Sequence, residues 1–393
     1  MSTDDRPSIA CVSGRRVVDV LAGMDVRTVL LGDPTPLDLA CLADVPLDVD
    51  LGDWKTTEVV LGALHRVRPL TAVFSVFDAH LPLASYLAER LDVRGLSLAA
   101  ALACDDKARM RLALEGAGIT GPRYLAVDDP ADAPSAARRL GFPVVVKKAV
   151  GARGRGSLVC HDDADVAGAV TAFGGGPVLV ESYVDGPEYA IQTITVDGVT
   201  EVVNVLAQHV GSGPRQPELG YDYPSGLGEV GDLAVGKFAT SALRALGFDN
   251  GVAHVQVRVS DDGPVLINVA ARPPGGQLCA LTERVSGVDM TRAAVDVALG
   301  LPLLRQEPTA SRALYRCVAF GQAGVVDYDV GALDSPGVFL DVEPGDPVHP
   351  ADDPRGGSYG RIVVYGDETP QLLRDYHGIL DSLRPRVRPS RMW

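Results

Sequence analysis

Alternating apolar and polar residues predict two paired strands in the second half of the chain. In Ala253–Val259 and Val265–Arg272, small or branched apolar residues alternate with larger polar residues, as is typical of strands. The residues between them include Asp262-Gly263, a pair that favours a hairpin turn. Each strand then has one polar face, formed by His254, Gln256 and Arg258 on the first and by Asn268, Ala270 and Arg272 on the second.

Two interpretations of this polar row remain open from the pattern alone. The row is followed at once by Pro273-Pro274-Gly275-Gly276, and paired strands that end in such a turn are suited to form the floor of a site. An antiparallel sheet also commonly exposes one polar face to water without any further role. The rest of the chain has to decide between a site and a solvated face.

The first hundred residues alternate short apolar strands with helices, a pattern that predicts a parallel sheet covered by helices. The expected strands are residues 8–13, 28–32 and 73–77, and the expected helices are residues 15–23 and 81–91. The first strand is not followed by Gly-x-Gly-x-x-Gly, which argues against a dinucleotide site there.

Mixed elements follow in the remainder. Strands are expected at 141–148, 157–160 and 177–181, a hairpin at 188–196 and 200–208, and helices at 105–117, 235–246, 290–299 and 371–383. Residues 211–231 are polar and rich in Gly and Pro, so we expect a long loop that interrupts the sheet and covers a substrate.

Size and composition indicate a globular protein of several units. At 393 residues the chain is too long for one ordinary core, and 46% hydrophobic and 22% charged residues are ordinary values. No apolar run approaches the roughly 18 residues of a membrane span, and the polar Met1–Pro7 does not look like a secretory signal, so we expect a cytoplasmic protein without a membrane partner. The six cysteines are scattered, which argues against a disulfide framework or structural zinc. A net charge of −15 argues against a nucleic-acid partner but allows a nucleotide where positive charge gathers locally.

Positive charge does gather around one Gly-rich loop. Gly151, Gly154 and Gly156 are spaced so that their N–H groups can converge on an anion, Arg153 and Arg155 lie between them, and Lys147 and Lys148 come just before. A plain turn is the alternative. The order strand, Lys, Gly-rich loop, strand differs from a P-loop, in which Gly-Lys-Ser/Thr opens a helix.

Taken together, these motifs resemble the ATP-grasp superfamily. Its entry to the central domain is matched by Asp106-Lys107, and its hinge by Val180–Glu188. The resemblance implies that Lys107, Lys147 and the 151–156 loop bind the phosphates of ATP. It also implies that Glu181 faces the adenine amino group, that Tyr183 and Val184 hold adenine through backbone groups, and that Glu188 binds the ribose hydroxyls.

The paired strands resemble the metal-binding strands of this superfamily, with two departures. The family places an acid two residues after His254 and another four residues before Arg272, and here both positions are amides, Gln256 and Asn268. Ala270 stands where the family has a further Asn. Because Mg²⁺ prefers carboxylate oxygen, the resemblance implies that these amides bind metal weakly or not at all. It assigns catalysis to Arg272 and to the N–H groups of Gly275 and Gly276.

The subgroup that the chain resembles is the L-amino-acid ligase-like carboxylate–amine ligases. The fold class implied is α/β with mixed α+β parts: an N-terminal Rossmann-like domain at 1–104, ATP-grasp subdomains at 105–180 and 181–305, and a β-rich C-terminal extension at 306–393. His209, Glu218 and His254 are the implied substrate residues, and a homodimer is the implied assembly.

Three functions follow from the resemblance. The first is an ADP-forming ligase that makes an amide or peptide bond between a small carboxylate and an amine through an acyl phosphate. The second is a pseudo-ligase that binds nucleotide or a small acid without phosphoryl transfer, because Gln256 and Asn268 are amides. The third is altered chemistry on the same scaffold.

Overall fold

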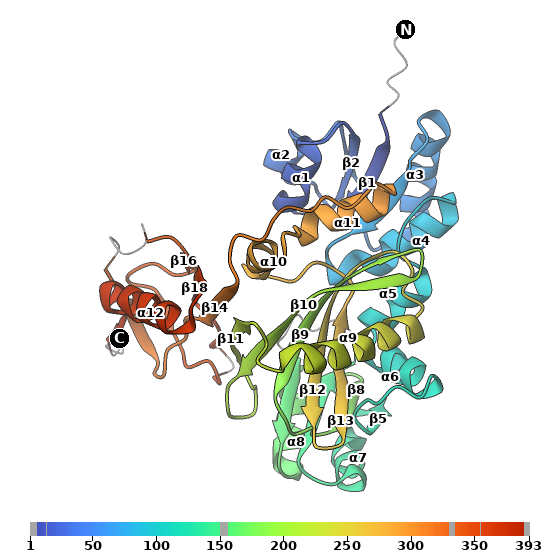
Figure 1. Ribbon diagram of the computed structural model, residues 1–393. Helices are drawn as coiled ribbons and strands as arrows, with labels where there is room; N and C mark the ends of the chain where they lie inside the picture. The colour runs from blue at the N-terminus through green and yellow to red at the C-terminus, as the bar shows by residue number, and fades with distance from the viewer. Residues whose placement is uncertain (1–5, 13, 150–155, 330–334, 354, 389–393) are drawn as a thin grey trace.

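The computed structural model describes residues 6–12, 14–149, 156–329, 335–353 and 355–388. It is a mixed α/β protein in which a parallel sheet, a small antiparallel sheet and a large antiparallel sheet follow one another along the chain (Figure 1). Among the residues described, no helix is both long and apolar enough to cross a bilayer.

The N-terminal unit is the parallel sheet that strand–helix alternation predicts. Its order is β3-β2-β1-β4, formed by Val45–Asp48, Arg27–Gly32, Ser8–Val12 and Ala72–Ser75. The helices of this unit are α1 (Arg15–Ala22), the short α2 (Leu37–Ala40), α3 (Trp54–Val67) and α4 (Leu81–Leu91). β1 and β2 are apolar and almost wholly buried, as expected for strands that are covered on both faces.

Two short helices lead into the small sheet. The single helix expected at 105–117 is instead α5 (Leu98–Asp105) followed by α6 (Lys107–Gly116). The break falls at Asp106, whose extended backbone ends α5 and whose carboxylate accepts hydrogen bonds from the Ala108 and Arg109 N–H groups. Asp106 thus acts as the N-cap of α6, a position at which Asp is more favourable than in the interior of a helix.

The small sheet, called the lid sheet below, has the antiparallel order β5-β8-β6-β7. Its strands are Tyr124–Val127, Val178–Ser182, Val144–Lys148 and Ser157–Cys160. Helices α7 (Ala133–Leu140) and α8 (Asp163–Ala172) bury an apolar cluster against one face of the sheet. Its other face is left to line a cavity with the large sheet.

The large sheet has the order β13-β12-β9-β10-β11-β14-β18-β16, and its strands pair antiparallel. They are Gly263–Ala270, Gly251–Ser260, Glu188–Val196, Val199–Val210, Glu218–Tyr223, Arg312–Cys317, Gly360–Gly366 and Val338–Leu340. The predicted hairpin is present as β12 and β13, with Gln256 directly opposite Asn268. The register shifts by one residue just after Gln256, so Ile267 forms a bulge beside the two amides.

The loop expected at 211–231 is a second wrong prediction about the elements around the site, after the single helix expected at 105–117. Residues 218–223 form β11, which pairs with both β10 and β14, and helix α9 (Gly228–Ala245) begins before the predicted loop ends. The glycine content misled the prediction, because Gly220 has φ +151° and allows β11 to approach Tyr315 of β14 closely.

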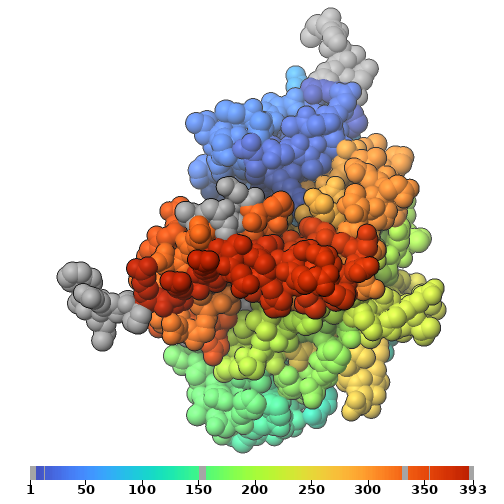
Figure 2. Space-filling view, turned by 60° about the vertical axis from the view of Figure 1, so that its left-hand side comes forward, coloured from blue at the N-terminus to red at the C-terminus, as the bar shows by residue number. Residues whose placement is uncertain are grey.

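The C-terminal residues extend the large sheet and add a small sheet beside it. β17 (Pro347–Val348), β15 (Gly324–Asp327) and β19 (Arg386–Arg388) form this small sheet, and α12 (Thr369–Leu383) packs on β18. In the space-filling view the C-terminal residues, in red and orange, lie between the blue N-terminal unit and the green lid sheet (Figure 2).

Helix α11 (Met290–Leu299) joins the N-terminal unit to the large sheet, and α10 (Leu278–Ser286) precedes it. Val295 and Leu299 pack with Ile9 and Phe74 of the parallel sheet, whereas Val297 packs with Ile194 of β9. One helix therefore contributes to two apolar cores and fixes the two sheets relative to each other.

Candidate functional site

A cavity of about 620 Å³ lies between the lid sheet and the large sheet. Strands β6 and β8 and residues 183–184 line it on one side, and β9, β10, β12 and β13 line it on the other. Asp78 of the N-terminal unit and Lys107 at the start of α6 complete one end. Its size and its mixed polar and apolar wall are those of a small-molecule site.

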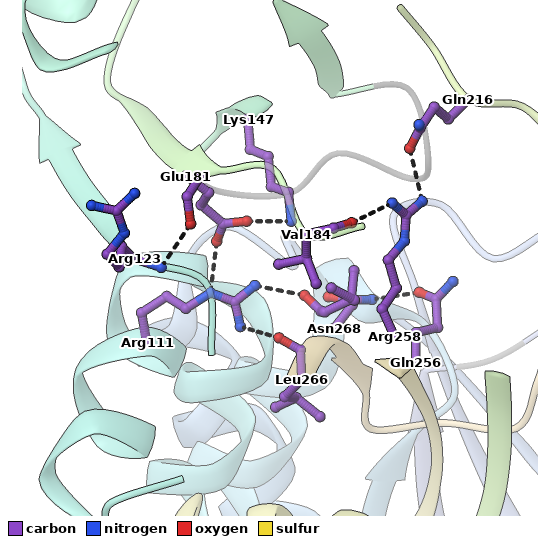
Figure 3. A network of polar contacts seen from close by, with 12 residues as sticks. Arg111, Arg123, Lys147, Glu181, Val184, Gln216, Gln256, Arg258, Leu266 and Asn268 are labelled. Atoms are coloured by element: carbon purple, nitrogen blue, oxygen red, sulfur yellow. Dashed lines mark hydrogen bonds and ion pairs between the residues drawn. The ribbon is translucent and has the colours of Figure 1, made fainter. Parts of the chain in front are cut away.

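Glu181 is the buried centre of an ion-pair network (Figure 3). Its carboxylate accepts from Arg111 Nε at 2.6 Å and from Lys147 Nζ at 2.7 Å, and Glu181 is 1% exposed. Burial would raise the pKa of Glu181, but Lys147 and Arg111 outweigh it and lower the pKa to about 2. Arg111 also donates to the carbonyls of Leu266 and Ile267, so the network ties the lid sheet to β13.

Lys107 places a second ammonium in the cavity wall. Burial and the neighbouring charge of Lys147 both lower the pKa of Lys107, and no salt bridge is found for its ammonium within the described ranges. An anion placed against Lys107 would relieve the unfavourable charge. This end of the cavity is therefore suited to a phosphate.

Glu188 is held by two partners from β12. Arg258 Nε donates to Glu188 Oε2 at 3.0 Å, and Gln256 Nε2 donates to Oε1 at 3.2 Å. Arg258 also donates to the carbonyl of Val184 and to Gln216 Oε1, both at 2.8 Å, so its guanidinium spans the hinge and the large sheet (Figure 3). These bonds fix the position of the carboxylate that the resemblance assigns to the ribose hydroxyls.

Gln256 and Asn268 contact each other directly across the hairpin. Asn268 Nδ2 donates to Gln256 Oε1 at 3.3 Å, and Gln256 Nε2 donates to Gln208 Oε1 at 3.2 Å. In the described part of the chain no group of three or more His, Cys, Asp or Glu side chains could hold a metal ion. A protein-held Mg²⁺ does not fit this donor set, because both side-chain oxygens are neutral and that of Gln256 already accepts a hydrogen bond from Asn268.

Arg272 closes the end of the cavity next to the N-terminal unit. Its Nε lies 2.9 Å from both carboxylate oxygens of Asp78, and its NH1 donates to the Pro273 carbonyl at 3.0 Å. The sequence predicts Arg272 as a catalytic cation, and the structure places it in the cavity wall with an acidic partner from a distant part of the chain.

Glu218 is the first residue of β11 and lines the cavity. Tyr221 Oη donates to Glu218 Oε2 at 2.6 Å, and Cys317 Sγ lies 3.7 Å from Oε1. The side chain lines the cavity. Burial raises the pKa of Glu218, and the hydrogen bond from the Tyr221 hydroxyl only partly offsets this rise. A carboxylate here is suited to face a cationic group.

Four predicted site residues lie outside the cavity wall. His254 is 8% exposed and bonds through Nδ1 to Gln192, while burial and then Arg272 lower its pKa to about 3. His209 points to the opposite face of β10 from Gln208 and bonds to Asp222, because alternate residues of a strand face opposite sides. Gly275 and Gly276 are exposed residues that do not line the wall.

The structure therefore brings eleven of the predicted residues into one cavity wall, and four more lie outside the described residues. Those in the wall are Lys107, Lys147, Gly156, Glu181, Tyr183, Val184, Glu188, Glu218, Gln256, Asn268 and Arg272. Those outside the described residues are Gly151, Arg153, Gly154 and Arg155.

Sequence reasoning missed three side chains that organise the site: Arg111, Arg258 and Asp78. A signal existed for Arg111, which lies four residues after Lys107 and so on the same face of its helix. Arg258 was recognised as part of the polar face but without a role. Asp78 gave no signal, since its partner is 194 residues away.

A family model described as an ATP-grasp domain matches residues 140–281, which include β6, β7 and β8 of the lid sheet and the hairpin of amides. Residues 140–281 form an ATP-grasp domain. Within them the lid sheet brings Lys147 to the cavity, and the hairpin of amides lines the same cavity.

Relatives and solved structures extend the similarity beyond that domain. The chain is 26% identical over 371 residues to the uncharacterized protein y4rH of Sinorhizobium fredii, covering 90% of this chain and 75% of y4rH. It is 18% identical over 259 residues to an L-arginine-specific L-amino acid ligase of Bacillus subtilis, covering 64% of this chain and 63% of the ligase.

Among solved structures, an L-amino acid ligase from Bacillus licheniformis superposes with a TM-score of 0.81 at 20% identity, covering 98% of this chain and 99% of the ligase. A carboxyaminoimidazole ribonucleotide synthase from Aspergillus clavatus, complexed with ATP, gives 0.76 at 17% identity and covers 98% and 100%. At such identities the likeness shows the ATP-grasp fold of the whole chain.

Proposed function

We propose that this ATP-grasp protein is an ATP-dependent ligase that joins a small, amino-acid-like carboxylic acid to an amine. The observation that carries the proposal is that Lys107, Lys147 and Arg272 line one cavity together with Tyr183 and Val184, where the resemblance implies adenine binding. The likeness to L-amino acid ligases in fold and in sequence supports the choice of carboxylate and amine as substrates.

In the proposed reaction, a carboxylate oxygen attacks the γ-phosphorus of ATP and ADP leaves. The amine nitrogen then attacks the acyl phosphate, the amide C–N bond forms, and phosphate leaves as the nitrogen loses a proton. Such transfers depend mainly on positioning and charge neutralisation. Lys107 and Lys147 would hold the phosphates, and Arg272 would face the developing oxyanion, a role in which one donor contributes about 3 kcal/mol.

The cavity wall also favours a substrate with a cationic group. Glu218 lines the cavity, where burial raises its pKa, and an ammonium beside it would lower that pKa again. We therefore place the amino group of an amino-acid substrate at Glu218. His209 and His254 take no part in this proposal, because neither lines the cavity.

One observation favours a second candidate, a nucleotide-binding protein that transfers no phosphate. Gln256 and Asn268 bond to each other where the resemblance implies acids, so the hairpin supplies neutral oxygens only. If phosphoryl transfer needs the missing charge, binding would persist without turnover.

Turnover distinguishes the two candidates. ADP and phosphate release would be measured with ATP, MgCl₂ and a panel of amino acids and amines. The ligase predicts amine-dependent ADP release that falls about a hundredfold or more in Arg272→Gln, while Lys237→Gln, an exposed lysine on α9, keeps wild-type turnover. Nucleotide binding with no ADP release across the panel would reject the ligase and leave the second candidate.

A further inference from the structure

The two amides of the hairpin, Gln256 and Asn268, are neutral side chains joined by a hydrogen bond. Gln256 uses its oxygen to accept from Asn268 and its nitrogen to donate to Gln208 and Glu188. Two carboxylates at the same positions would repel each other, and the pair would need a cation between them. The two amides are neutral, and one N–H···O bond, from Asn268 Nδ2 to Gln256 Oε1, joins them without an ion.

The acids nearest to the amide pair are also taken by protein cations. Glu188 is paired with Arg258, Glu181 with Arg111 and Lys147, and both oxygens of Asp78 lie against Arg272. Asp105 also lines the cavity, near Lys107 and Asp78, and burial raises its pKa, which disfavours the anion that a metal would need. No described group of acids is thus free to bind a divalent ion.

Cationic side chains face the same space. Lys107 and Arg215 line the cavity without an ion pair among the described residues, and Lys147 lies next to Lys107. Burial and Lys147 disfavour the charge on Lys107, so an anion bound there is stabilised more strongly than at an exposed lysine. This part of the cavity wall is therefore suited to bind an anion.

We infer that this site binds the phosphates of a nucleoside di- or triphosphate without a divalent cation, because Lys107 and Lys147 provide the neutralising charge and the Gln256–Asn268 pair replaces metal-ligating acids. The inference rests on the nucleotide binding that the proposed function includes. It distinguishes this chain from a site in which acidic strands recruit the metal with the nucleotide.

Calorimetry with ADP tests the inference directly. The whole chain would be titrated with ADP in excess EDTA and again in MgCl₂. We expect dissociation constants that agree within about threefold, since no protein ligand gains from the metal. Binding that is lost in EDTA, or that Mg²⁺ tightens more than about tenfold (1.4 kcal/mol), would overturn the inference. Absence of ADP binding in both conditions would also overturn it.

Three variants sharpen the result. Gln256→Glu/Asn268→Glu restores two acids across the hairpin, and we expect it to bind ADP about tenfold more tightly in MgCl₂ than in EDTA. Lys107→Gln should weaken binding about tenfold in both conditions, and Lys237→Gln should change neither. An unchanged metal response in the double variant, or unchanged binding in Lys107→Gln, would contradict the inference. The turnover assay above fails or succeeds independently, because it measures ADP release and not metal dependence.

Discussion

The carboxylate of Glu181 lies between the guanidinium of Arg111 and the ammonium of Lys147, and all three side chains are almost fully buried. A buried ion pair adds little net stability compared with apolar residues, but removal of one partner leaves an uncompensated charge. At this site the uncompensated charges would be two cations, of which Lys147 lines the cavity. The same ion pairs that contribute to folding therefore also hold Lys147 in place in the cavity wall.

Glu181→Gln should lower the free energy of unfolding by about 3–5 kcal/mol, because it strands Arg111 and Lys147. Urea denaturation at neutral pH measures the loss, and Glu229→Gln, an exposed acid on α9, should change stability by less than about 0.5 kcal/mol. A loss below about 1 kcal/mol for Glu181→Gln would contradict this account of the network.

His254 gives a prediction about pH. Its pKa is lowered from 6.5 to about 3 in the folded protein, so below pH 6.5 the unfolded chain binds a proton that the folded protein refuses. Its contribution to stability is therefore complete above 6.5 and is lost as the pH falls from 6.5 towards 3, by up to about 1.4 kcal/mol per pH unit. In urea denaturation at pH 7.5 and 5.5, His254→Gln should lose less stability between the two pH values than wild type. Equal losses would show that His254 is not held neutral.

Strand β11 decides how the C-terminal strands join the large sheet. Its position depends on Gly220, where an added Cβ would lie 2.1 Å from the Tyr315 carbonyl oxygen of β14. The same strand brings Glu218 to the cavity and pairs with β10, whose alternation sends Gln208 inward and His209 outward. A glycine that looks like a loop residue is thus required by close strand contact.

Gly220→Ala should therefore separate β11 from β14 and cost about 1–3 kcal/mol. Hydrogen exchange should show faster exchange of the β14 amides, and the α9 amides should be unaffected. Gly168→Ala, in α8 with nothing within 4 Å of the added Cβ, is the matched control and should raise stability by up to about 1 kcal/mol. Unchanged exchange in β14 would refute the close-contact explanation.

The elements that carry a clear period were predictable, and the contacts between them were not. Alternation located β12 and β13, but the register of the turn would place Gln256 opposite Ile267, and the bulge at Ile267 brings Asn268 opposite Gln256 instead. The pairing of Arg258 with Glu188 joins residues 70 positions apart, and that of Arg272 with Asp78 joins residues 194 apart. Periodicity carries no information about which charged residues pair across such separations in sequence. The structure was therefore needed to show that Glu188 and Asp78 are paired with arginines.

At the scale of the molecule, the cavity is a meeting point of three units. The lid sheet supplies Lys147 and Glu181, the large sheet supplies the amide pair and Arg258, and the N-terminal unit supplies Asp78 for Arg272. Because α11 packs into the cores on both sides, the N-terminal unit and the large sheet hold this arrangement together. At this junction we expect a nucleotide to bind to the cationic side chains of the protein without a divalent metal ion.

A crystal structure of the protein soaked with ATP and MgCl₂ would reveal the ligands of the phosphates and of any metal ion. We expect adenine beside residues 181–184 and phosphates on Lys107 and Lys147. We also expect Gln256 and Asn268 to remain hydrogen-bonded to each other, with no metal ion on either amide oxygen. A nucleotide bound elsewhere, or a Mg²⁺ ion coordinated by Gln256 and Asn268, would refute binding on Lys107 and Lys147 without a metal.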